Sequence, residues 1–220
     1  MGDLTLRRRT DAQLGVEIFE VKLGDEFLMS SLFTVAEEEL ARLGLAAVRG
    51  DQLQVLVGGL GLGYTAIAAL RDPRVGAMTV IDTLPAVIDW HQRGLLPVSE
   101  LLTGDPRTRL VLDDFFAVMR QAPGPAEVRY DAILLDVDHS PRHQLDPSHA
   151  DLYTEAGLHA VALHLAEAGV FALWSDDPPD DEFVATLTAV FDQVHAHVVD
   201  FANPLTGGTS SNTVYVATRR

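Results

Sequence analysis

Glycine is concentrated in one short stretch of the chain, where backbone geometry can serve binding chemistry. An apolar run of strand type, 53–57, precedes this stretch, and an alanine-rich segment of helical type, 64–70, follows it. A glycine turn between a strand and a helix lets the backbone approach a bound nucleotide-like molecule closely. The stretch therefore predicts such a ligand, with an ordinary tight turn as the alternative. The four glycines are Gly58, Gly59, Gly61 and Gly63.

The spacing of these glycines distinguishes between two kinds of nucleotide-like ligand. The dinucleotide pattern G-x-G-x-x-G would need a glycine where the chain has Leu60 or Tyr64. The pattern over 59–63 is instead G-x-G-x-G, which resembles the turn of class I S-adenosylmethionine (AdoMet) methyltransferases. AdoMet has no pyrophosphate, so the glycine that lies under a pyrophosphate is not needed. We therefore expect the turn to bind AdoMet or decarboxylated AdoMet.

Acidic residues stand where the next two strands of the expected sheet end. Asp82 follows the second strand, 77–81, and a carboxylate there can accept hydrogen bonds from both ribose hydroxyls. Asp114 follows the third strand, 109–112, where an acid in this fold commonly meets the adenine amino group. Either residue could instead cap the helix that comes after it. The two carboxylates predict a ribose contact and an adenine contact.

The fourth strand leads into an acidic loop, and here the chain resembles a known family. Residues 130–136 have the sequence Tyr-Asp-Ala-Ile-Leu-Leu-Asp, and Asp138 and His139 follow. Together with the glycine turn, Asp82 and the Gly-Asp-Pro-Arg sequence at 104–107, this pattern resembles the spermidine synthases. The resemblance implies an AdoMet-type ligand beside Asp136 and an amine acceptor. Shortened versions of that family's N-terminal hairpins are suggested by residues 14–19, 25–28 and 37–38.

The chain departs from those synthases at two positions that matter for the reaction. Leu62 stands where the synthases carry an aspartate that anchors the amine of decarboxylated AdoMet, and His139 replaces the second acid of an Asp-x-x-Asp pair. A leucine cannot supply the charge-assisted hydrogen bond to that amine, worth about 1.5–3 kcal/mol. The sequence therefore favours methyl transfer to a small polar or amine acceptor over aminopropyl transfer. Positioning of donor and acceptor would supply most of the rate, with acceptor orientation and proton removal assigned to Asp136, Asp138 and His139.

Three further residues are candidate acceptor contacts, and other readings of the acidic loop stay open. Tyr153 and Trp174 could wall the acceptor site or belong to the core, and Asp176 follows the fifth strand. We expect no metal, but metal-dependent O-methyltransferases resemble the chain at the same positions. In that alternative, carboxylates would hold Mg²⁺. A non-catalytic nucleoside-binding subunit is another alternative. The alternative metal ligands are Asp136, Asp176 and Asp177.

The amino-acid composition excludes some kinds of functional site and disfavours some kinds of binding partner. The chain of 220 residues has no cysteine, which excludes disulfides, zinc-thiolate sites and a cysteine nucleophile. A net charge of -16 disfavours nucleic acid and anionic membranes and suits a cationic amine. With no apolar leader and no uninterrupted apolar span, we expect a cytoplasmic protein. Of the histidines, His143 and His149 share the loop of His139 and could act as bases.

The elements that must position these residues alternate regularly after residue 53. Strands are expected at the positions given above and at 169–174, and helices at 151–166 and 180–193. This alternation predicts an α/β fold with a mostly parallel, seven-stranded Rossmann-like sheet covered by helices on both faces. Before it, an extended hairpin has a turn at Gly24-Asp25, and a helix opens at Thr34 with Glu37 completing a capping box.

The chain is expected to divide into two parts. Residues 1–50 would form the N-terminal hairpin and capping helix, and residues 51–220 the AdoMet-binding domain, which closes with strands near 195–202 and 213–218. A hairpin of this size cannot build a core of its own. We therefore expect it to join a symmetric homodimer.

Overall fold

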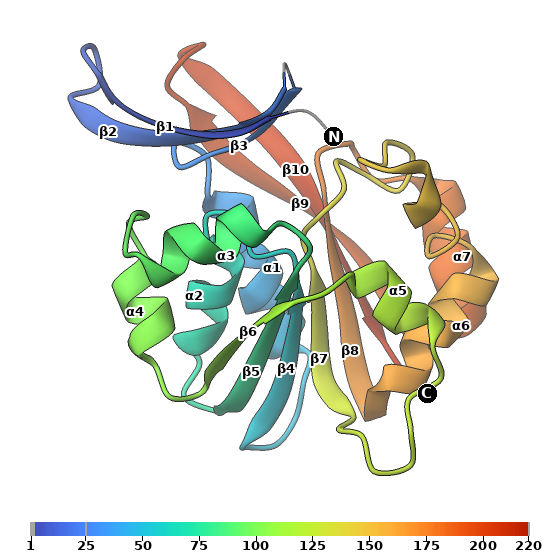
Figure 1. Ribbon diagram of the computed structural model, residues 1–220. Helices are drawn as coiled ribbons and strands as arrows, with labels where there is room; N and C mark the ends of the chain where they lie inside the picture. Colours follow the sequence, from blue (N-terminus) through green and yellow to red (C-terminus); the bar gives the residue numbers. More distant parts are fainter. Residues whose placement is uncertain (1–2, 25, 220) are drawn as a thin grey trace.

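The computed structural model describes residues 3–24 and 26–219, which form a small antiparallel sheet beside a large mixed one (Figure 1). The small sheet, in the order β1-β2-β3, consists of β1 (Leu4–Asp11), β2 (Val16–Leu23) and β3 (Glu26–Ser30). Asp25, the second residue of the expected turn, lies outside the described residues. The strands of the large sheet are β4 (Leu53–Gly58), β5 (Val75–Asp82), β6 (Thr108–Leu112), β7 (Tyr130–Leu135), β8 (Leu165–Ser175), β9 (Gln193–Asn203) and β10 (Gly208–Thr218).

The large sheet has seven strands in the order β6-β5-β4-β7-β8-β10-β9. The five strands from β6 to β8 in this order are parallel to one another, and β10 is antiparallel to both of its neighbours, β8 and β9. Parallel neighbours require crossover connections, and the intervening helices supply them. The predicted α/β class with a mostly parallel, seven-stranded sheet is confirmed.

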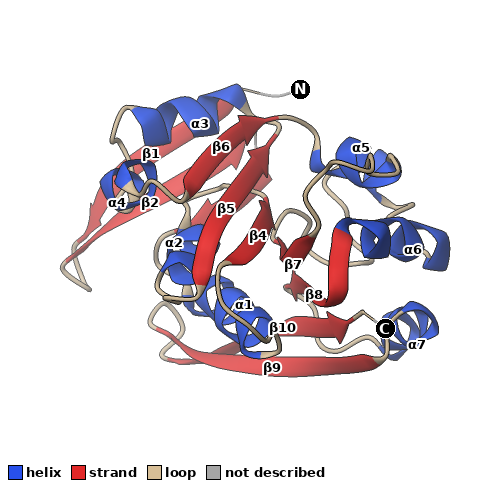
Figure 2. Cartoon of the chain, turned by 90° about the horizontal axis from the view of Figure 1, so that it is seen from below, coloured by secondary structure: helices blue, strands red, loops and turns tan. Residues whose placement is uncertain are grey.

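Helices cover both faces of the large sheet, as Figure 2 shows. One face packs against the first four helices and the other against the last three. Each face therefore encloses its own apolar core, and the central strands are buried on both sides. The helices are α1 (Val35–Ala46), α2 (Tyr64–Leu70), α3 (Pro85–Gln92), α4 (Ser99–Gly104), α5 (Phe115–Arg120), α6 (Glu155–His164) and α7 (Asp181–Val190).

Alternation along β7 assigns its residues to the two cores. Ala132 and Leu134 pack on the α1 side, whereas Ile133 and Leu135 pack on the α5–α7 side. This is the two-residue period of an extended strand, which sends successive side chains to opposite faces. The same parity directs the next residue, Asp136, toward the α1 side.

The start of α6 and the cap of α1 differ from those expected. Helix α6 begins at Glu155 because the Thr154 hydroxyl caps it, accepting from the Gly157 N–H at 3.2 Å. The expected capping box at the start of α1 is wrong: Thr34 precedes the helix but makes no side-chain cap bond. Its hydroxyl lies 3.3 Å from Glu38 Oε1 instead, which leaves Glu37 available for other contacts.

The small sheet covers the glycine turn of the large domain. Phe19 and Val21 of β2 pack against Leu62 and Leu96 in a buried apolar cluster. In Figure 1 the blue strands β1–β3 lie over this end of the molecule, beside the far end of the β9–β10 hairpin. Leu62 is thus part of the apolar contact with the small sheet.

Helix α1 packs against α2 and the large sheet, although the expected boundary at residue 50 groups it with the small sheet. That boundary, like the homodimer, stays a prediction. Within the part of the chain described here, no helix combines the length and apolar character needed to cross a bilayer.

Two Asp-Pro-Arg turns fasten the ends of helices on the α1 side. The Arg74 guanidinium donates to the carbonyls of Leu45 and Val48, each at 2.8 Å, at the end of α1. Arg107, from the motif noted at 104–107, does the same at the end of α2, donating to Leu70 O at 2.9 Å. Each arginine thus supplies hydrogen-bond donors to carbonyls at or just beyond the end of a helix, where intrahelical donors run out.

Candidate functional site

The strand order of the large sheet reverses between β4 and β7, and the candidate site lies at this point. The connection after β4 leads away toward β5 and β6, whereas the one after β7 leads toward β8. In open α/β sheets the crevice beyond the carboxyl ends of such strands is where ligands bind. The glycine turn follows β4, and Asp136 follows β7, with its N–H donating to Gly58 O at 2.8 Å.

The glycine turn has a backbone that other residues could not adopt here. Gly59 and Gly63 have φ of +93° and +89°, in the left-handed region. A Cβ at Gly59 would also lie 2.0 Å from the Asp136 carbonyl oxygen, and one at Gly63 would lie 2.8 Å from the His91 ring. The turn therefore needs glycine both for its dihedral angles and for its close contact with the end of β7.

Asp82 holds the glycine turn from the end of β5. Its Oδ2 accepts from Leu60 N–H at 2.9 Å and from Gly61 N–H at 3.4 Å, and its Oδ1 accepts from Leu84 N–H at 2.8 Å. Burial raises the pKa of the Asp82 carboxyl, and the three N–H donors oppose that rise. The residue thus joins the turn to the start of α3, and its ribose contact stays a prediction.

His91 is a supporting residue of the turn that the sequence analysis did not single out. It is fully buried in α3, with Nε2 at 3.0 Å from Gly61 O. Because a carbonyl can only accept, Nε2 carries the proton, and Nδ1 is left to face Ser99 Oγ at 3.3 Å. Burial lowers the pKa of His91, which favours this neutral ring. A lone histidine in a helix gave no sequence signal for the role.

Asp136 lies on the α1 side with a protein hydroxyl beside it. Thr65 Oγ1 donates to Asp136 Oδ2 at 2.6 Å and lies 3.3 Å from the Glu37 carbonyl. Burial raises the pKa of Asp136 to about 6. A carboxyl with such a pKa can take up and release a proton near neutral pH, as a general base must.

Glu37, in the first turn of α1, is a second acid of this site. Burial, together with the nearby charges of Asp136, Glu38 and Asp176, raises its pKa to about 8. Sequence reasoning assigned Glu37 to a helix cap, because nothing in the local pattern reveals a contact between α1 and the end of β7. The site therefore contains, beside Asp136, a carboxyl that the sequence analysis did not assign to it.

Asp138 turns to the opposite side of the sheet and is enclosed by donors. Leu145 N–H and His149 Nδ1 each lie 2.8 Å from Asp138 Oδ1, and the Tyr153 hydroxyl donates to Oδ2 at 2.6 Å. Asp138 is 1% exposed. These contacts tie the loop after β7 to the region before α6. The structure thus separates Asp138 and Tyr153 from Asp136, and their catalytic and acceptor roles stay predictions.

Trp174 and Asp176 share the α1 side with Asp136. Leu135 of β7 lies opposite Leu173 of the parallel strand β8, so the next residue of each strand points to the same face. Within the described chain, the buried Trp174 Nε1 has no hydrogen-bond partner. A buried donor without an acceptor is costly, and a bound ligand is one way to satisfy it.

The end of β8 is joined to the loop after β7 and to β10. Asp176 N–H donates to His139 O at 2.7 Å, and Asp176 Oδ1 accepts from Asn212 Nδ2 at 2.7 Å. Asp176 remains exposed at the rim of the site. The backbone of His139 is thereby fixed next to the candidate acceptor contacts, and a catalytic role for its side chain stays a prediction.

Two of the alternative metal ligands, Asp176 and Asp177, have different partners in the structure. Asp176 lies in the bend after β8, where its Oδ1 accepts from Asn212 Nδ2 at 2.7 Å. Asp177 lies 3.4 Å from His143 Nδ1 and lines a cavity on the α7 side. Across residues 3–24 and 26–219, no three His, Cys, Asp or Glu side chains are arranged to hold a metal ion.

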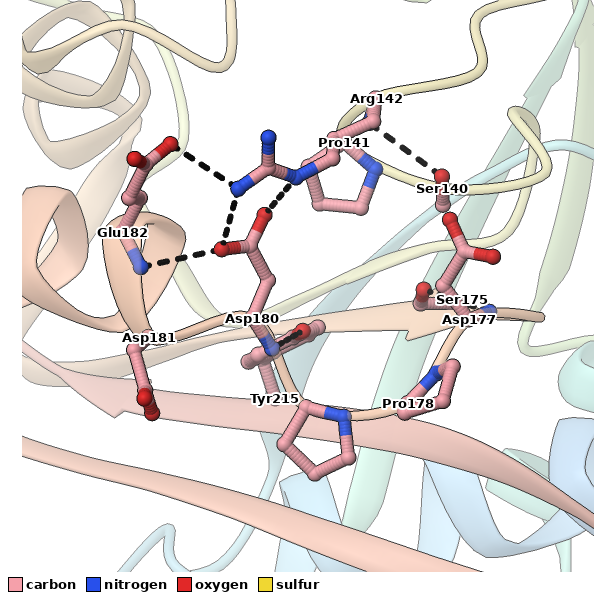
Figure 3. Close-up of a pocket in the computed structure, with 11 residues that line it drawn as sticks. Ser140, Pro141, Arg142, Ser175, Asp177, Pro178, Asp180, Asp181, Glu182 and Tyr215 are labelled. Atoms are coloured by element: carbon pink, nitrogen blue, oxygen red, sulfur yellow. Dashed lines mark hydrogen bonds and ion pairs between the residues drawn. The ribbon is translucent and has the colours of Figure 1, made fainter.

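The cavity that Asp177 lines lies between the loop at 140–142 and the start of α7, as Figure 3 shows. Two of its acidic side chains are engaged by Arg142, whose guanidinium contacts Asp180 at 2.6 Å and Glu182 at 2.9 Å. No residue of the glycine turn lines it. The cavity is therefore distinct from the site at the strand-order reversal.

Asp114 acts as a helix cap in this structure. Its Oδ1 accepts from Phe116 N–H at 2.9 Å and from Ala117 N–H at 3.2 Å, at the start of α5. One carboxylate oxygen and the remaining lone pairs are not used by these two bonds. The predicted adenine contact is therefore compatible with the cap and stays a prediction.

Comparison with known proteins shows which folds and sequences the chain is similar to. No model of a protein family matches it. Putrescine N-methyltransferase 2 from Nicotiana tabacum is 30% identical over 133 residues, which cover 60% of this chain and 35% of that protein. The protein of the same name from Nicotiana attenuata matches at the same identity, over 33% of its length. The chain thus spans about a third of the length of these curated relatives.

Solved structures extend the similarity to nearly the whole chain. Spermidine synthase from Thermotoga maritima superposes with a TM-score of 0.74 at 19% identity, covering 99% of this chain and 70% of that one. Human methyltransferase-like protein 13, in complex with SAH, has a TM-score of 0.58 at 20% identity, covering 85% and 79%. These likenesses confirm the predicted spermidine synthase-like fold of the class I methyltransferase type.

Proposed function

We propose that the protein transfers the methyl group of AdoMet to a small amine acceptor. The observation that carries this proposal is the pair of acids, Asp136 and Glu37, on one side of the sheet next to the glycine turn. Acidic groups there suit a cationic acceptor, and the turn has the backbone geometry for an adenosyl ligand. The match to putrescine N-methyltransferases supports the same acceptor class.

The chemistry requires the acceptor nitrogen to lose a proton before it reacts. The nitrogen lone pair then attacks the methyl carbon while the carbon–sulfur bond breaks, and the sulfonium leaves as a neutral thioether. Asp136, with its pKa raised to about 6, would take the proton from the ammonium group and pass it to water. Alignment of the two reactants would supply the rest of the acceleration.

The same proposal assigns residue roles around the donor. We assign the adenosyl group to the glycine turn, the ribose hydroxyls to Asp82 and the adenine amino group to Asp114. Trp174 Nε1, a buried donor on the same side as Asp136, would find an acceptor on the donor or on the acceptor molecule. AdoMet carries a carboxylate that can serve this purpose, whereas decarboxylated AdoMet does not.

A product analysis tests the reaction. The protein is incubated with putrescine and either AdoMet or decarboxylated AdoMet, and the products are separated by mass. We expect N-methylated amine and S-adenosylhomocysteine from the first mixture. Spermidine from the second mixture, with no methylated amine from the first, would establish aminopropyl transfer instead. Tight binding of both donors with no product from a panel of amines would indicate a non-catalytic nucleoside-binding protein.

A further inference from the structure

The start of α1 and the end of β7 meet at one hydroxyl group. Thr65 Oγ1, which is buried, lies 2.6 Å from Asp136 Oδ2 and 3.3 Å from the Glu37 carbonyl oxygen. The first turn of α1 is thereby held against the carboxylate that follows β7. Glu37 is accordingly a neighbour of the acceptor site, although it is far from Asp136 in the sequence.

We propose that Glu37 is a specificity-determining residue, whose carboxylate binds an ammonium group of the acceptor together with Asp136. The inference rests on the proposed function and deepens it, because it names the second carboxylate of the site and the charge of its ligand. An aliphatic amine cation fits between two such acids, whereas an alcohol or a phenol offers no positive charge to them.

The charges that act on Glu37 agree with this role. The groups facing it from its own helix, from β7 and from β8 are Glu38, Asp136 and Asp176, and all are acidic. Tyr64 of α2 lies near the same helix start: burial raises the pKa of its hydroxyl, and the charges of Glu38 and Glu37 add to the rise. Of these acids, Glu38 is paired with Arg71 at 2.6 Å. An arriving cation therefore enters a region of negative potential.

Proton release on amine binding is a measurable signature of the arrangement. The pKa of Glu37 is raised to about 8 and that of Asp136 to about 6, so near pH 7 the pair retains a proton on Glu37. An ammonium group beside Glu37 lowers its pKa again, and that proton leaves. Binding of the amine should therefore release a proton near pH 7, and release should diminish above the pKa of Glu37.

The experiment compares Glu37→Gln with Glu39→Gln, a matched control two residues along the same helix. Glu39 forms an exposed ion pair with Arg42 and has no place in the site. Each protein is saturated with S-adenosylhomocysteine, which prevents turnover, and titrated with putrescine by calorimetry. Parallel titrations in buffers of different ionisation enthalpy count the protons released. Glu37→Asp, which keeps the charge on a shorter side chain, serves as the conservative variant.

We expect Glu37→Gln to bind putrescine roughly tenfold to hundredfold more weakly, as expected for losing a hydrogen bond between charged groups. Its proton release should vanish, and its affinity for S-adenosylhomocysteine should be unchanged. Glu39→Gln should match the wild type in every respect, and Glu37→Asp should recover part of the affinity.

Three other results would either overturn the role of Glu37 or separate it from the proposed function. Unchanged putrescine affinity and proton release in Glu37→Gln would overturn it. A wild type that binds S-adenosylhomocysteine but no amine would also overturn it, while leaving the donor assignment standing. A wild type that binds putrescine with release of a proton that Glu37→Gln lacks, but no adenosyl ligand, would support the role of Glu37 and refute the proposed function.

Discussion

Asp136 and Asp138 stand two residues apart after the same strand and occupy opposite environments. Asp138 is almost fully buried, and its carboxylate accepts hydrogen bonds from a backbone N–H, a histidine ring nitrogen and a tyrosine hydroxyl. Asp136 receives the Thr65 hydroxyl, and its pKa and that of Glu37 are both raised. A buried carboxylate surrounded by donors stabilises the fold, whereas one placed beside other acids is suited to bind a proton or a cation.

The largest expected effect of this difference is on turnover. Asp136→Asn removes the proposed base, so the rate of methyl transfer should fall by about 10²–10⁴-fold, the usual contribution of general base catalysis. At pH values above 6, the melting temperature of this variant should equal or exceed that of the wild type, because a costly buried charge has been removed. Steady-state kinetics and thermal unfolding on one preparation measure both quantities. A variant that is unstable yet active would reverse the assignment of the two aspartates.

Asp138→Asn should show the opposite behaviour, with stability as the affected quantity. An amide cannot accept from all three donors, and the free energy of unfolding should drop by about 3 kcal/mol, since unsatisfied buried groups cost about 1–3 kcal/mol each. Denaturant titration measures the loss. Asp89→Asn, which breaks an exposed ion pair with Arg93, is the control and should cost less than about 1 kcal/mol. Equal effects of the two substitutions would argue against a structural role for Asp138.

A smaller effect is expected in the pH dependence of stability. The folded-state pKa of Glu37 is raised from 4.5 to about 8, so the folded protein retains a proton that the unfolded chain releases. Stability from this group is therefore present below about pH 4.5 and is lost as the pH rises through about 8. Glu37→Gln removes the loss, and its advantage over wild type should grow across this range by on the order of 1–3 kcal/mol. A constant difference between the two proteins from pH 4 to pH 9 would contradict the raised pKa.

The smallest expected effect comes from the hydroxyl beside Asp136. The Thr65 hydroxyl lowers the pKa of Asp136 against the effect of burial. Thr65→Val keeps the shape and removes this donor, so the acid limb of the pH–rate profile should move to higher pH. The maximal rate should change little. A limb that stays in place would show that the observed ionisation belongs to another group.

Sequence reasoning was sufficient where the function depends on local pattern. The glycine turn, the strands around it and the positions of Asp82 and Asp136 follow from short apolar runs that end in glycine or aspartate. These features need only the period of a strand and the dihedral freedom of glycine. The turn does have the left-handed glycines that its pattern indicated.

Local sequence patterns do not reveal which distant segments of the chain come into contact. Glu37 meets Asp136 only because α1 folds against the end of β7, and His91 meets Gly61 only because α3 packs under the turn. After Val137 the chain turns so that Asp138 lies on the other side of the sheet. This turn depends on the contacts of Asp138 with Leu145, His149 and Tyr153. The sequence pattern places Leu62 in the donor site. In the structure its side chain is only 5% exposed, because the small sheet covers it.

Placement of Leu62 in an apolar cluster changes how donor preference should be tested. An aspartate there would bring an unpaired charge into contact with Phe19 and Val21, and its effect on binding would be confounded with its effect on folding. The wild-type chain is therefore the better subject. Its own preference between the two donors reports whether the turn favours a zwitterion or a lone ammonium group.

The most direct test of methyl transfer is a calorimetric titration of the wild type with AdoMet and with decarboxylated AdoMet. The carboxylate of AdoMet can use N–H groups at the start of α2 and the free Trp174 donor, whereas the decarboxylated donor has no such group. We predict that AdoMet binds at least as tightly as its decarboxylated form. A tenfold preference for the decarboxylated donor, about 1.4 kcal/mol, would contradict methyl transfer and point to aminopropyl transfer.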